Sequence, residues 1–416
     1  MEYIKRLADK TLTGRLKTAG AVLIRGPKAC GKTWTANEQQ KSRIDIDTDA
    51  SVPNLIAFEP TKLLEGEAPR LIDEWQEQPV LWNLIRREVD NRGKSGQFIL
   101  TGSANPVVDA KLHSGVGRFS IMTMRTMSWA ELGWSSGNIS LGGLLAGEAI
   151  KSDTLKVTYD DIINRIIVGG WPKNLNRSVD EARQANVDYY DLLADADMAR
   201  ATGKVRDPNR VRAVLKSLAR NVSTNAEVAT IMSDAKMSVD LLGRTTVDDY
   251  LDTLERLMIL VNQPAFNPHI RSTAELRKTP KRHLADASLA VAALNLDYDK
   301  LFADPNYLGF LFESTAIHDL LVYADANDAK VSFYRDSYGN EIDAIVEMRS
   351  GEWAAFEVKL GNDKYDEAAG NLLKLAENID EAKTPKPKSL NIITGVGLSY
   401  TRPDGVNVIS LSSLGA

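Results

Sequence analysis

Cysteine and histidine are scarce in this chain, and their scarcity excludes two common ways of stabilising a fold. Cys30 is the only cysteine among 416 residues, so no disulfide can form within the chain. The four histidines are scattered, and none has the spacing of a zinc site. We therefore expect a fold that depends on packing alone, as is typical of proteins in a reducing cytoplasm.

Long apolar runs are also missing. No stretch reaches the roughly 20 apolar residues that cross a bilayer, and residues 1–6 lack the apolar segment of a secretory signal. We expect a cytoplasmic protein with no membrane partner. Hydrophobic residues make up 43% of the chain and charged residues 26%. This composition is ordinary for globular proteins, and the length predicts two to four domains.

The chain lacks an excess of positive charge. Its formal net charge is −5 and its isoelectric point is about 5.6, which argues against non-specific coating of nucleic acid. Two segments are nevertheless rich in arginine and lysine, one near Arg206 to Arg220 and one from Arg271 to Arg282. Basic clusters in an acidic chain favour an anionic partner. DNA is the partner that we expect, and a protein partner or a second copy of the chain is the alternative.

A glycine-rich loop with a lysine stands near the N-terminus. Residues 26–33 match G-x-x-x-x-G-K-[ST], the phosphate-binding loop of nucleoside triphosphatases. Residues 21–24 predict a strand before the loop and residues 34–40 a helix after it, an arrangement that points a helix N-terminus at phosphate. We expect Lys32 to reach the β- and γ-phosphates of ATP and Thr33 to bind Mg²⁺. The residues expected to bind the nucleotide are Gly26, Pro27, Lys28, Ala29, Cys30, Gly31, Lys32 and Thr33.

Two acids follow the next apolar strand. Asp73 and Glu74 come directly after residues 70–72, about forty residues beyond the glycine-rich loop. A phosphate-loop enzyme needs an acid that organises the water around Mg²⁺ and a group that orients the attacking water. We expect Asp73 to take the first role and Glu74 the second.

Further short motifs follow in order along nearly the whole chain. They are Leu71–Gln76, Leu100–Ser103, Gly117–Arg118, Met127–Leu132, Gly169–Pro172 and Leu218–Asn221. Together they resemble a family of bacterial and archaeal AAA-type ATPases with a C-terminal domain of unknown function. The resemblance implies that Thr101 or Ser103, with Ser103 favoured, touches the γ-phosphate or the attacking water. It also implies that Arg118 senses the phosphate or acts as an arginine finger, although a salt-bridged surface arginine is the alternative.

The middle of the chain predicts three helices, at residues 211–221, 224–231 and 245–257, followed by a strand at 258–261. Three helices followed by a strand pair are typical of a winged helix, which places a helix in the major groove of DNA. The third helix carries Asp248, Asp249, Asp252 and Glu255, and acids repel phosphate. DNA contact would therefore fall to the first helix and the wing, and a protein-binding module remains the alternative.

Two strands near the C-terminus alternate with a period of two. Glu357 and Lys359 share one face of a strand that includes residues 354–359, and a hairpin through 349–351 brings Asp343 near them. This pattern resembles the core of restriction-endonuclease-like phosphodiesterases. There, Asp343 and Glu357 would hold Mg²⁺, Lys359 would orient water, and Glu313 would add a fourth ligand. A degenerate fold used for binding and a set of unconnected surface charges both remain open.

The sequence thus predicts an α/β protein. We expect a P-loop ATPase domain with an AAA-type parallel sheet (1–155), a helical connector (156–205), a winged-helix-like domain (206–290) and an endonuclease-like α/β domain (291–416). The first hypothesis for function is an ATPase that requires Mg²⁺ and couples its nucleotide state to DNA binding or processing. The second is a nucleotide-dependent switch that binds a protein partner through a non-catalytic nuclease fold.

Overall fold

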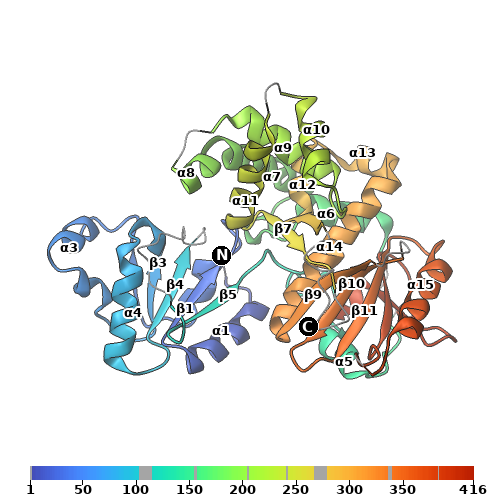
Figure 1. The fold of residues 1–416 in the computed structure, drawn as a ribbon, viewed down its shortest axis with the longest axis horizontal. Coiled ribbons are helices and arrows are strands. Elements are labelled where there is room, and N and C mark those ends of the chain that lie inside the picture. The colour runs from blue at the N-terminus through green and yellow to red at the C-terminus, as the bar shows by residue number, and fades with distance from the viewer. Residues whose placement is uncertain are drawn as a thin grey trace. The chain divides into compact units, whose positions relative to one another are not determined.

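The computed structural model describes residues 2–102, 115–153, 157–203, 206–239, 242–266, 279–335, 340–382 and 384–416. The chain divides into two compact units (Figure 1). We call Met1–Thr126 with Arg256–Met258 the N-terminal unit, and Met127–Glu255 with Ile259–Ala416 the C-terminal unit.

A parallel sheet forms the centre of the N-terminal unit. Its described strands lie in the order β2-β3-β4-β1-β5, and every neighbouring pair is parallel. The strands are β1 (Ala21–Arg25), β2 (Ser42–Asp45), β3 (Arg70–Asp73), β4 (Phe98–Gly102) and β5 (Phe119–Thr123). The three inner strands are buried almost throughout, which explains why they read as continuous apolar runs in the sequence.

Helices cover both faces of this sheet. Leu23 points to a core that contains Trp82 and Ile85 of α4, whereas its neighbour Val22 points to a core that contains Leu12 of α1. The helices are α1 (Leu7–Thr18), α2 (Lys32–Asn37), α3 (Val52–Phe58) and α4 (Val80–Arg92), with 3₁₀ turns η1 (Pro60–Leu64) and η2 (Trp75–Glu77). This layering confirms the predicted α/β domain with a parallel sheet.

The first half of the C-terminal unit is mainly helical. Its helices start at side chains that accept backbone N–H bonds, such as Thr158 before α6, Ser178 before α7 and Asp207 before α9. The helices are α5 (Leu141–Ala146), α6 (Tyr159–Val168), α7 (Val179–Leu192), α8 (Met198–Thr202), α9 (Pro208–Arg220), α10 (Val228–Lys236), α11 (Arg244–Arg256), α12 (Ala287–Ala293) and α13 (Tyr298–Ala303), with a 3₁₀ turn η3 (Pro172–Asn174) and a π-helical turn η4 (Leu193–Asp197). Two antiparallel strands, β7 (Leu260–Gln263) and β8 (Lys281–Leu284), follow α11.

The second half of the C-terminal unit is built on a mixed sheet. Its described strands lie in the order β13-β14-β12-β11-β10-β9. They are β9 (Ala329–Arg335), β10 (Glu341–Met348), β11 (Trp353–Lys359), β12 (Leu390–Thr394), β13 (Tyr400–Thr401) and β14 (Asn407–Ser410). The pairs β9–β10 and β10–β11 are antiparallel, and β11–β12 is parallel.

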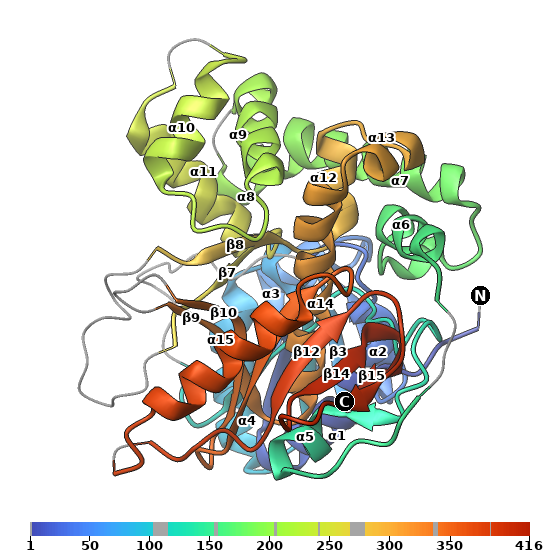
Figure 2. The ribbon, with the colours of Figure 1, turned by 90° about the vertical axis from the view of Figure 1, so that its right-hand side faces the viewer.

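Two helices pack on this mixed sheet. The apolar helix α14 (Pro305–Ala326) contacts β9, β10 and β11, and α15 (Tyr365–Asn378) contacts β11 and β12 (Figure 2). A 3₁₀ turn η6 (Leu411–Ser413) and strand β15 (Leu414–Gly415) end the chain, and β15 pairs with β6 (Ile139–Ser140). Within the described residues, no helix has the length and apolar character that a bilayer crossing requires.

The long first segment of the N-terminal unit ends at Thr126, whereas the sequence predicts a domain boundary at 155. Residues 127–153 lie in the C-terminal unit because hydrogen bonds and the β6–β15 pair attach them there. Trp129 N–H donates to the buried Asp319 carboxylate at 2.9 Å, and Met127 N–H donates to Gly170 O at 2.7 Å. The segments predicted as three further domains, 156–205, 206–290 and 291–416, lie in the C-terminal unit except for residues 256–258. Their division into separate domains stays a prediction.

Replacing Asp319 by alanine should destabilise the C-terminal unit. Its carboxylate accepts bonds from Trp129 N–H and from the Tyr323 hydroxyl, which lies 3.1 Å away, and both donors would be left buried without this acceptor. We expect a loss of about 1–3 kcal/mol in the free energy of unfolding, measured by urea titration of tryptophan fluorescence. Glu381→Ala, an exposed matched change, should stay within about 0.5 kcal/mol. Equal midpoints for the two variants would contradict this role of Asp319.

Candidate functional site

The glycine-rich loop connects the end of β1 to the start of α2. Gly31 adopts φ 105°, in the left-handed region that favours glycine, immediately before Lys32 begins the helix. A Cβ added at Gly26 would lie 2.1 Å from Met124 O, so only glycine fits where the loop passes the residue that follows β5. Cys30 is fully buried, and its thiol lies 3.7 Å from the same oxygen. These contacts make Cys30 a packed loop residue.

Lys32 lies across the loop that it follows. Its ammonium donates to Gly26 O at 3.0 Å and to Pro27 O at 2.9 Å, and its side chain is only 6% exposed. A phosphate bound at the loop would offer this ammonium a charged acceptor in place of two neutral carbonyls. The structure therefore places Lys32 where the sequence analysis expects a phosphate contact.

Asp73, at the end of β3, contacts side chains from helix α2 and from the neighbouring strands β2 and β4. Its Oδ1 accepts a hydrogen bond from Thr33 at 3.1 Å and another from Thr101, and its Oδ2 lies 3.0 Å from a guanidinium nitrogen of Arg43. The carboxyl ends of parallel strands meet at one sheet edge, and the loop after β1, the end of β3 and the end of β4 meet here. The expected metal ligands Thr33 and Asp73 thus lie together, and a hydroxyl and a carboxylate suit a hydrated Mg²⁺ ion.

Glu74 turns away from β3 in a left-handed conformation, with φ 51°. Such a backbone costs a non-glycine residue about 1–3 kcal/mol, and strained residues of this kind cluster at functional sites. Burial raises the pKa of its carboxyl group, whereas a hydrogen bond from Gln76 and the charge of Lys32 lower it. A half-buried carboxyl near Lys32 with a raised pKa is suited to accept a proton from water.

Ser103 and Arg118 are the two remaining candidate residues of the nucleotide site, and the structure does not place either of them at the loop. Ser103 lies outside the described residues, and Thr101 is the hydroxyl that contacts Asp73. Arg118 is not brought to the loop of its own chain. Its carbonyl accepts from Ala21 N–H at the start of β1, about 13 Å along the strand from the end that carries the loop. Its guanidinium pairs with Asp90 at 2.8 Å, and 40% of its side chain is exposed.

Two arginines at this site are absent from the sequence analysis. Arg43 of β2 reaches Asp73, and Arg6 before α1 donates to Cys30 O at 2.9 Å and to Arg125 O at 2.9 Å. Arg6 therefore ties the glycine-rich loop to the segment after β5. Neither residue belongs to a motif, and alternation along β2 is the only signal in the sequence that relates Arg43 to this sheet edge.

The charged residues predicted near the C-terminus also come together. Asp343 on β10 lies opposite Glu357 on β11, because Ala344 pairs with Phe356 in the antiparallel register. Lys359 lies 2.6 Å from Glu357 Oε2 and 3.5 Å from Asp343 Oδ2, and Val358 N–H donates to Asp343 Oδ2 at 2.9 Å. The structure thus joins these side chains into one buried cluster.

Lys281 of β8 is a member of this cluster that the sequence analysis missed. Its ammonium lies 3.0 Å from Glu313 Oε1, 2.7 Å from Glu341 Oε1 and 2.9 Å from Asp343 Oδ1. Glu313 of α14 is therefore present, as expected, but its partner is a lysine. We call these side chains the carboxylate cluster. It consists of Lys281, Glu313, Glu341, Asp343, Glu357 and Lys359.

Burial and charge act in opposite directions within the carboxylate cluster. Burial, reinforced by repulsion from Asp343, raises the pKa of Glu313 and that of Glu357 to about 8. Burial also opposes ionisation of Asp343, but the charges of Lys281 and Lys359 outweigh it and hold the pKa of Asp343 below its ordinary value. Burial lowers the pKa of the neighbouring His283 to about 3, so this imidazole is neutral at physiological pH.

The carboxylate cluster does not fit a divalent metal ion in the arrangement observed. Among the described residues, no group of three or more His, Cys, Asp or Glu side chains is arranged to hold a metal. Both oxygens of Asp343 and one oxygen of Glu357 already bond to N–H groups or ammonium groups. Lys281 and Lys359 therefore occupy the carboxylate oxygens with which Asp343 and Glu357 were predicted to hold Mg²⁺.

The described arginines of the first basic cluster form ion pairs. Arg206 pairs with Asp249 of α11, Arg212 with Asp191 and Asp195, and Arg220 with Asp234 at 2.8 Å. Lys204, next to the first cluster, lies outside the described residues, as do residues 271–278 of the second cluster. Acids of the C-terminal unit therefore offset much of the positive charge that the sequence shows, although exposed pairs of this kind are weak.

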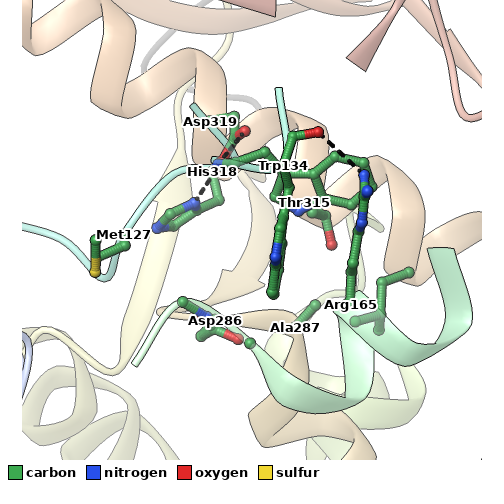
Figure 3. A pocket seen from close by; sticks show the side chains of 12 residues that line it. Met127, Trp134, Arg165, Asp286, Ala287, Thr315, His318 and Asp319 are labelled. Atoms are coloured by element: carbon green, nitrogen blue, oxygen red, sulfur yellow. Dashed lines mark hydrogen bonds and ion pairs between the residues drawn. The ribbon is translucent and has the colours of Figure 1, made fainter. Parts of the chain in front are cut away.

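A small, partly open pocket of about 20 Å³ lies between α6, α12, α14 and residues 127–134 (Figure 3). The guanidinium of Arg165 stacks 5.0 Å from the ring of Trp129 and 5.6 Å from that of Trp134, and it donates to Trp134 O at 3.1 Å. His318 and Asp319 lie on another wall, with Nδ1 and Oδ1 3.2 Å apart. Sequence reasoning gave no indication of this pocket, because its walls come from segments nearly 190 residues apart.

Comparisons with known proteins divide the chain into three parts. Residues 18–133 match the model of an AAA domain. Residues 159–300 and 308–414 match models that are each described as a domain of unknown function, DUF8612 and DUF4143. The AAA match agrees with the strand, loop and helix geometry, and it confirms the prediction of an AAA-type P-loop domain in the N-terminal part.

Two proteins are similar to most of the chain at low sequence identity. The chain is 25% identical over 363 residues to uncharacterized protein Rv2008c of Mycobacterium tuberculosis and, with the same values, to Mb2031c of Mycobacterium bovis, covering 85% of this chain and 74% of each relative. Among solved structures, it resembles the Walker-type ATPase PABY2304 of Pyrococcus abyssi, with 12% identity, a TM-score of 0.44 and coverage of 70% of this chain and 96% of that one. It also resembles the Aeropyrum pernix ORC1 protein in complex with DNA, with 16% identity, a TM-score of 0.23 and coverage of 73% and 94%.

Substituting Lys32 by alanine should remove most of the affinity for ATP. The ammonium already bonds to two loop carbonyls, and losing one or two charge-assisted hydrogen bonds to phosphate would weaken binding about 100-fold. Calorimetric titration with ATP and Mg²⁺ measures this loss. Lys17→Ala removes an exposed lysine from α1 and should bind as the wild type does. Wild-type affinity in Lys32→Ala would mean that ATP does not bind at this loop.

Proposed function

We propose that the protein binds ATP with Mg²⁺ at residues 26–33 and hydrolyses it. The observation that carries the proposal is the meeting of Thr33, Asp73 and Thr101 beside Lys32 at one edge of a parallel sheet. Thr33 would bind Mg²⁺ and Asp73 would organise its water shell, and the ion would supply charge neutralisation at the phosphates. Lys32 and the loop N–H groups would hold the phosphates themselves.

Glu74 is the residue that we assign to the attacking water. Its carboxyl group lies near Lys32, directly after Asp73, and its raised pKa makes it a stronger base than an exposed glutamate. The hydrogen bond from Gln76 orients this carboxyl group. The Thr101 hydroxyl donates to the Asp73 carboxylate, and we assign Thr101 the role of holding that carboxylate in place.

Arg118 would act only on the nucleotide of another copy of the chain. Within its own chain it lies at the far end of β1, yet it is exposed and pairs with a surface acid, Asp90. An exposed ion pair is easily exchanged for a phosphate contact. Arg118 therefore supports a self-associated enzyme in which one copy completes the site of the next.

We further propose that the nucleotide state controls DNA binding by the C-terminal unit. The order of α9, α10, α11, β7 and β8 supports a winged-helix interpretation, and the order of α14, β9, β10, β11, α15 and β12 supports an endonuclease-like one. A second candidate function is a switch that binds a protein partner. It is favoured by the pairing of Arg206, Arg212 and Arg220 with acids, which leaves less charge for phosphate.

Glu74→Gln should separate nucleotide binding from hydrolysis. The amide keeps the size of the side chain but cannot accept a proton from water, so turnover should fall at least 100-fold while ATP affinity stays within about twofold. Steady-state phosphate release and calorimetry measure the two quantities. Glu77→Gln, an exposed change in the adjacent η2 turn, should leave turnover unchanged. Normal turnover in Glu74→Gln would move the catalytic role to another residue.

Duplex DNA should bind more tightly in the presence of ATP, and salt should weaken that binding. With three phosphate contacts, affinity measured by fluorescence anisotropy would fall roughly 40-fold between 50 and 200 mM salt. Lys32→Ala should lose the dependence on ATP. An affinity that is equal with and without ATP, or that salt does not change, would favour the switch that binds a protein partner.

A further inference from the structure

Lys281 holds the position that a metal ion would need in the carboxylate cluster. Its ammonium, with a side chain only 2% exposed, bonds to one oxygen each of Glu313, Glu341 and Asp343 at 2.7–3.0 Å. These three carboxylates come from α14 and β10, and the lysine comes from β8. A single positive charge therefore joins three acids from two other elements.

Two further carboxylate oxygens beside this position are also bonded. Asp343 Oδ2 accepts from Val358 N–H at 2.9 Å and lies 3.5 Å from Lys359, and Glu357 Oε2 lies 2.6 Å from the same lysine. Mg²⁺ needs oxygen ligands at about 2.0–2.1 Å and a near-octahedral shell. An ammonium bonded to the same oxygens would stand close enough to repel the ion strongly. Lys281 and a divalent ion are therefore alternative occupants.

The strand that carries Lys281 is held on both sides. His283 lies 3.1 Å from Gln263, and Gln263 donates to Asp343 O at 2.8 Å, so the β7–β8 pair is attached to β10. Arg282 attaches the same strand to the connection between α9 and α10. Its backbone N–H donates to Thr224 O at 3.0 Å, and its guanidinium donates to Ala226 O. Bonds to β10 and to the α9–α10 connection therefore fix the strand that places Lys281.

We propose that Lys281 is the resident cation of the carboxylate cluster, and that its ammonium excludes a divalent metal ion from the cluster. This inference rests on the proposed endonuclease-like character of the C-terminal unit, and it adds a control on the metal site of that unit. Removing the ammonium leaves four carboxylates beside two cations, Lys359 and Arg335, of which Arg335 lies 3.9 Å from Glu341. The cluster then gains affinity for a divalent cation.

The test compares Mn²⁺ binding by the full chain with and without Lys281, in the absence of nucleotide and DNA. Lys281→Met keeps the length of the side chain and removes its charge. We expect this variant to bind Mn²⁺ at least tenfold more tightly than the wild type, by electron paramagnetic resonance of free Mn²⁺. Adding Asp343→Asn should abolish the gain. Lys386→Met, which removes an exposed lysine paired with Glu381, should bind as the wild type does.

A buried substitution can also unfold the protein, so a second variant and a second measurement are needed. Lys281→Gln retains a hydrogen-bond donor for the acids while removing the charge, and it should show the same gain. Mn²⁺ should raise the thermal midpoint of both variants by several degrees and leave that of the wild type unchanged, because a ligand stabilises the state that binds it.

Two results would overturn the inference. One is equal Mn²⁺ affinity in wild type, Lys281→Met and Lys281→Gln, and the other is no Mn²⁺ binding to the cluster in any of the three. Cleavage of DNA by the same variants addresses the proposed function separately. Mn²⁺ bound through Asp343 without any cleavage would leave Lys281 as the competitor of the metal and would reject the nuclease activity.

Discussion

The parallel register of the N-terminal sheet is the constraint on which the nucleotide site depends. Because β1, β3 and β4 run in the same direction, the residues that follow each of them arrive at one edge. This places Thr33 and Thr101 on the same oxygen of Asp73, although the three residues come from α2, β4 and β3. The short helix α2, the strained backbone of Glu74 and the position of Lys32 all follow from where these strands end.

The features that the sequence predicted well are those encoded within a few residues. A loop with fixed glycines, acids at the end of an apolar strand, and the period of two that sets Glu357 beside Lys359 are local patterns. Local patterns survive folding because backbone geometry alone determines which side chains share a face. The AAA-type domain and the grouping of Asp343 with Glu357 could be predicted for this reason.

The features that the sequence did not reveal depend on contacts between distant segments. Arg6 reaches residue 125, Trp129 reaches Asp319, and Lys281 reaches Asp343 across 62 residues. No motif records such a contact, since either partner would look like an ordinary surface or core residue. Arg118 illustrates the same limit, because a motif order cannot tell which end of a strand a residue will occupy. The pairing of Arg206 with Asp249 likewise offsets a positive charge that the sequence alone assigns to a basic cluster.

The bonds from Lys32 to Gly26 O and Pro27 O bear on how quickly and how tightly the loop can capture an anion. A loop held shut by its own lysine has already lost most of its conformational freedom on folding, so little entropy remains to be lost when a ligand arrives. The ammonium would exchange acceptors over a short distance without passing through bulk solvent. Capture at such a preorganised loop is limited by diffusion and desolvation rather than by rearrangement of the backbone.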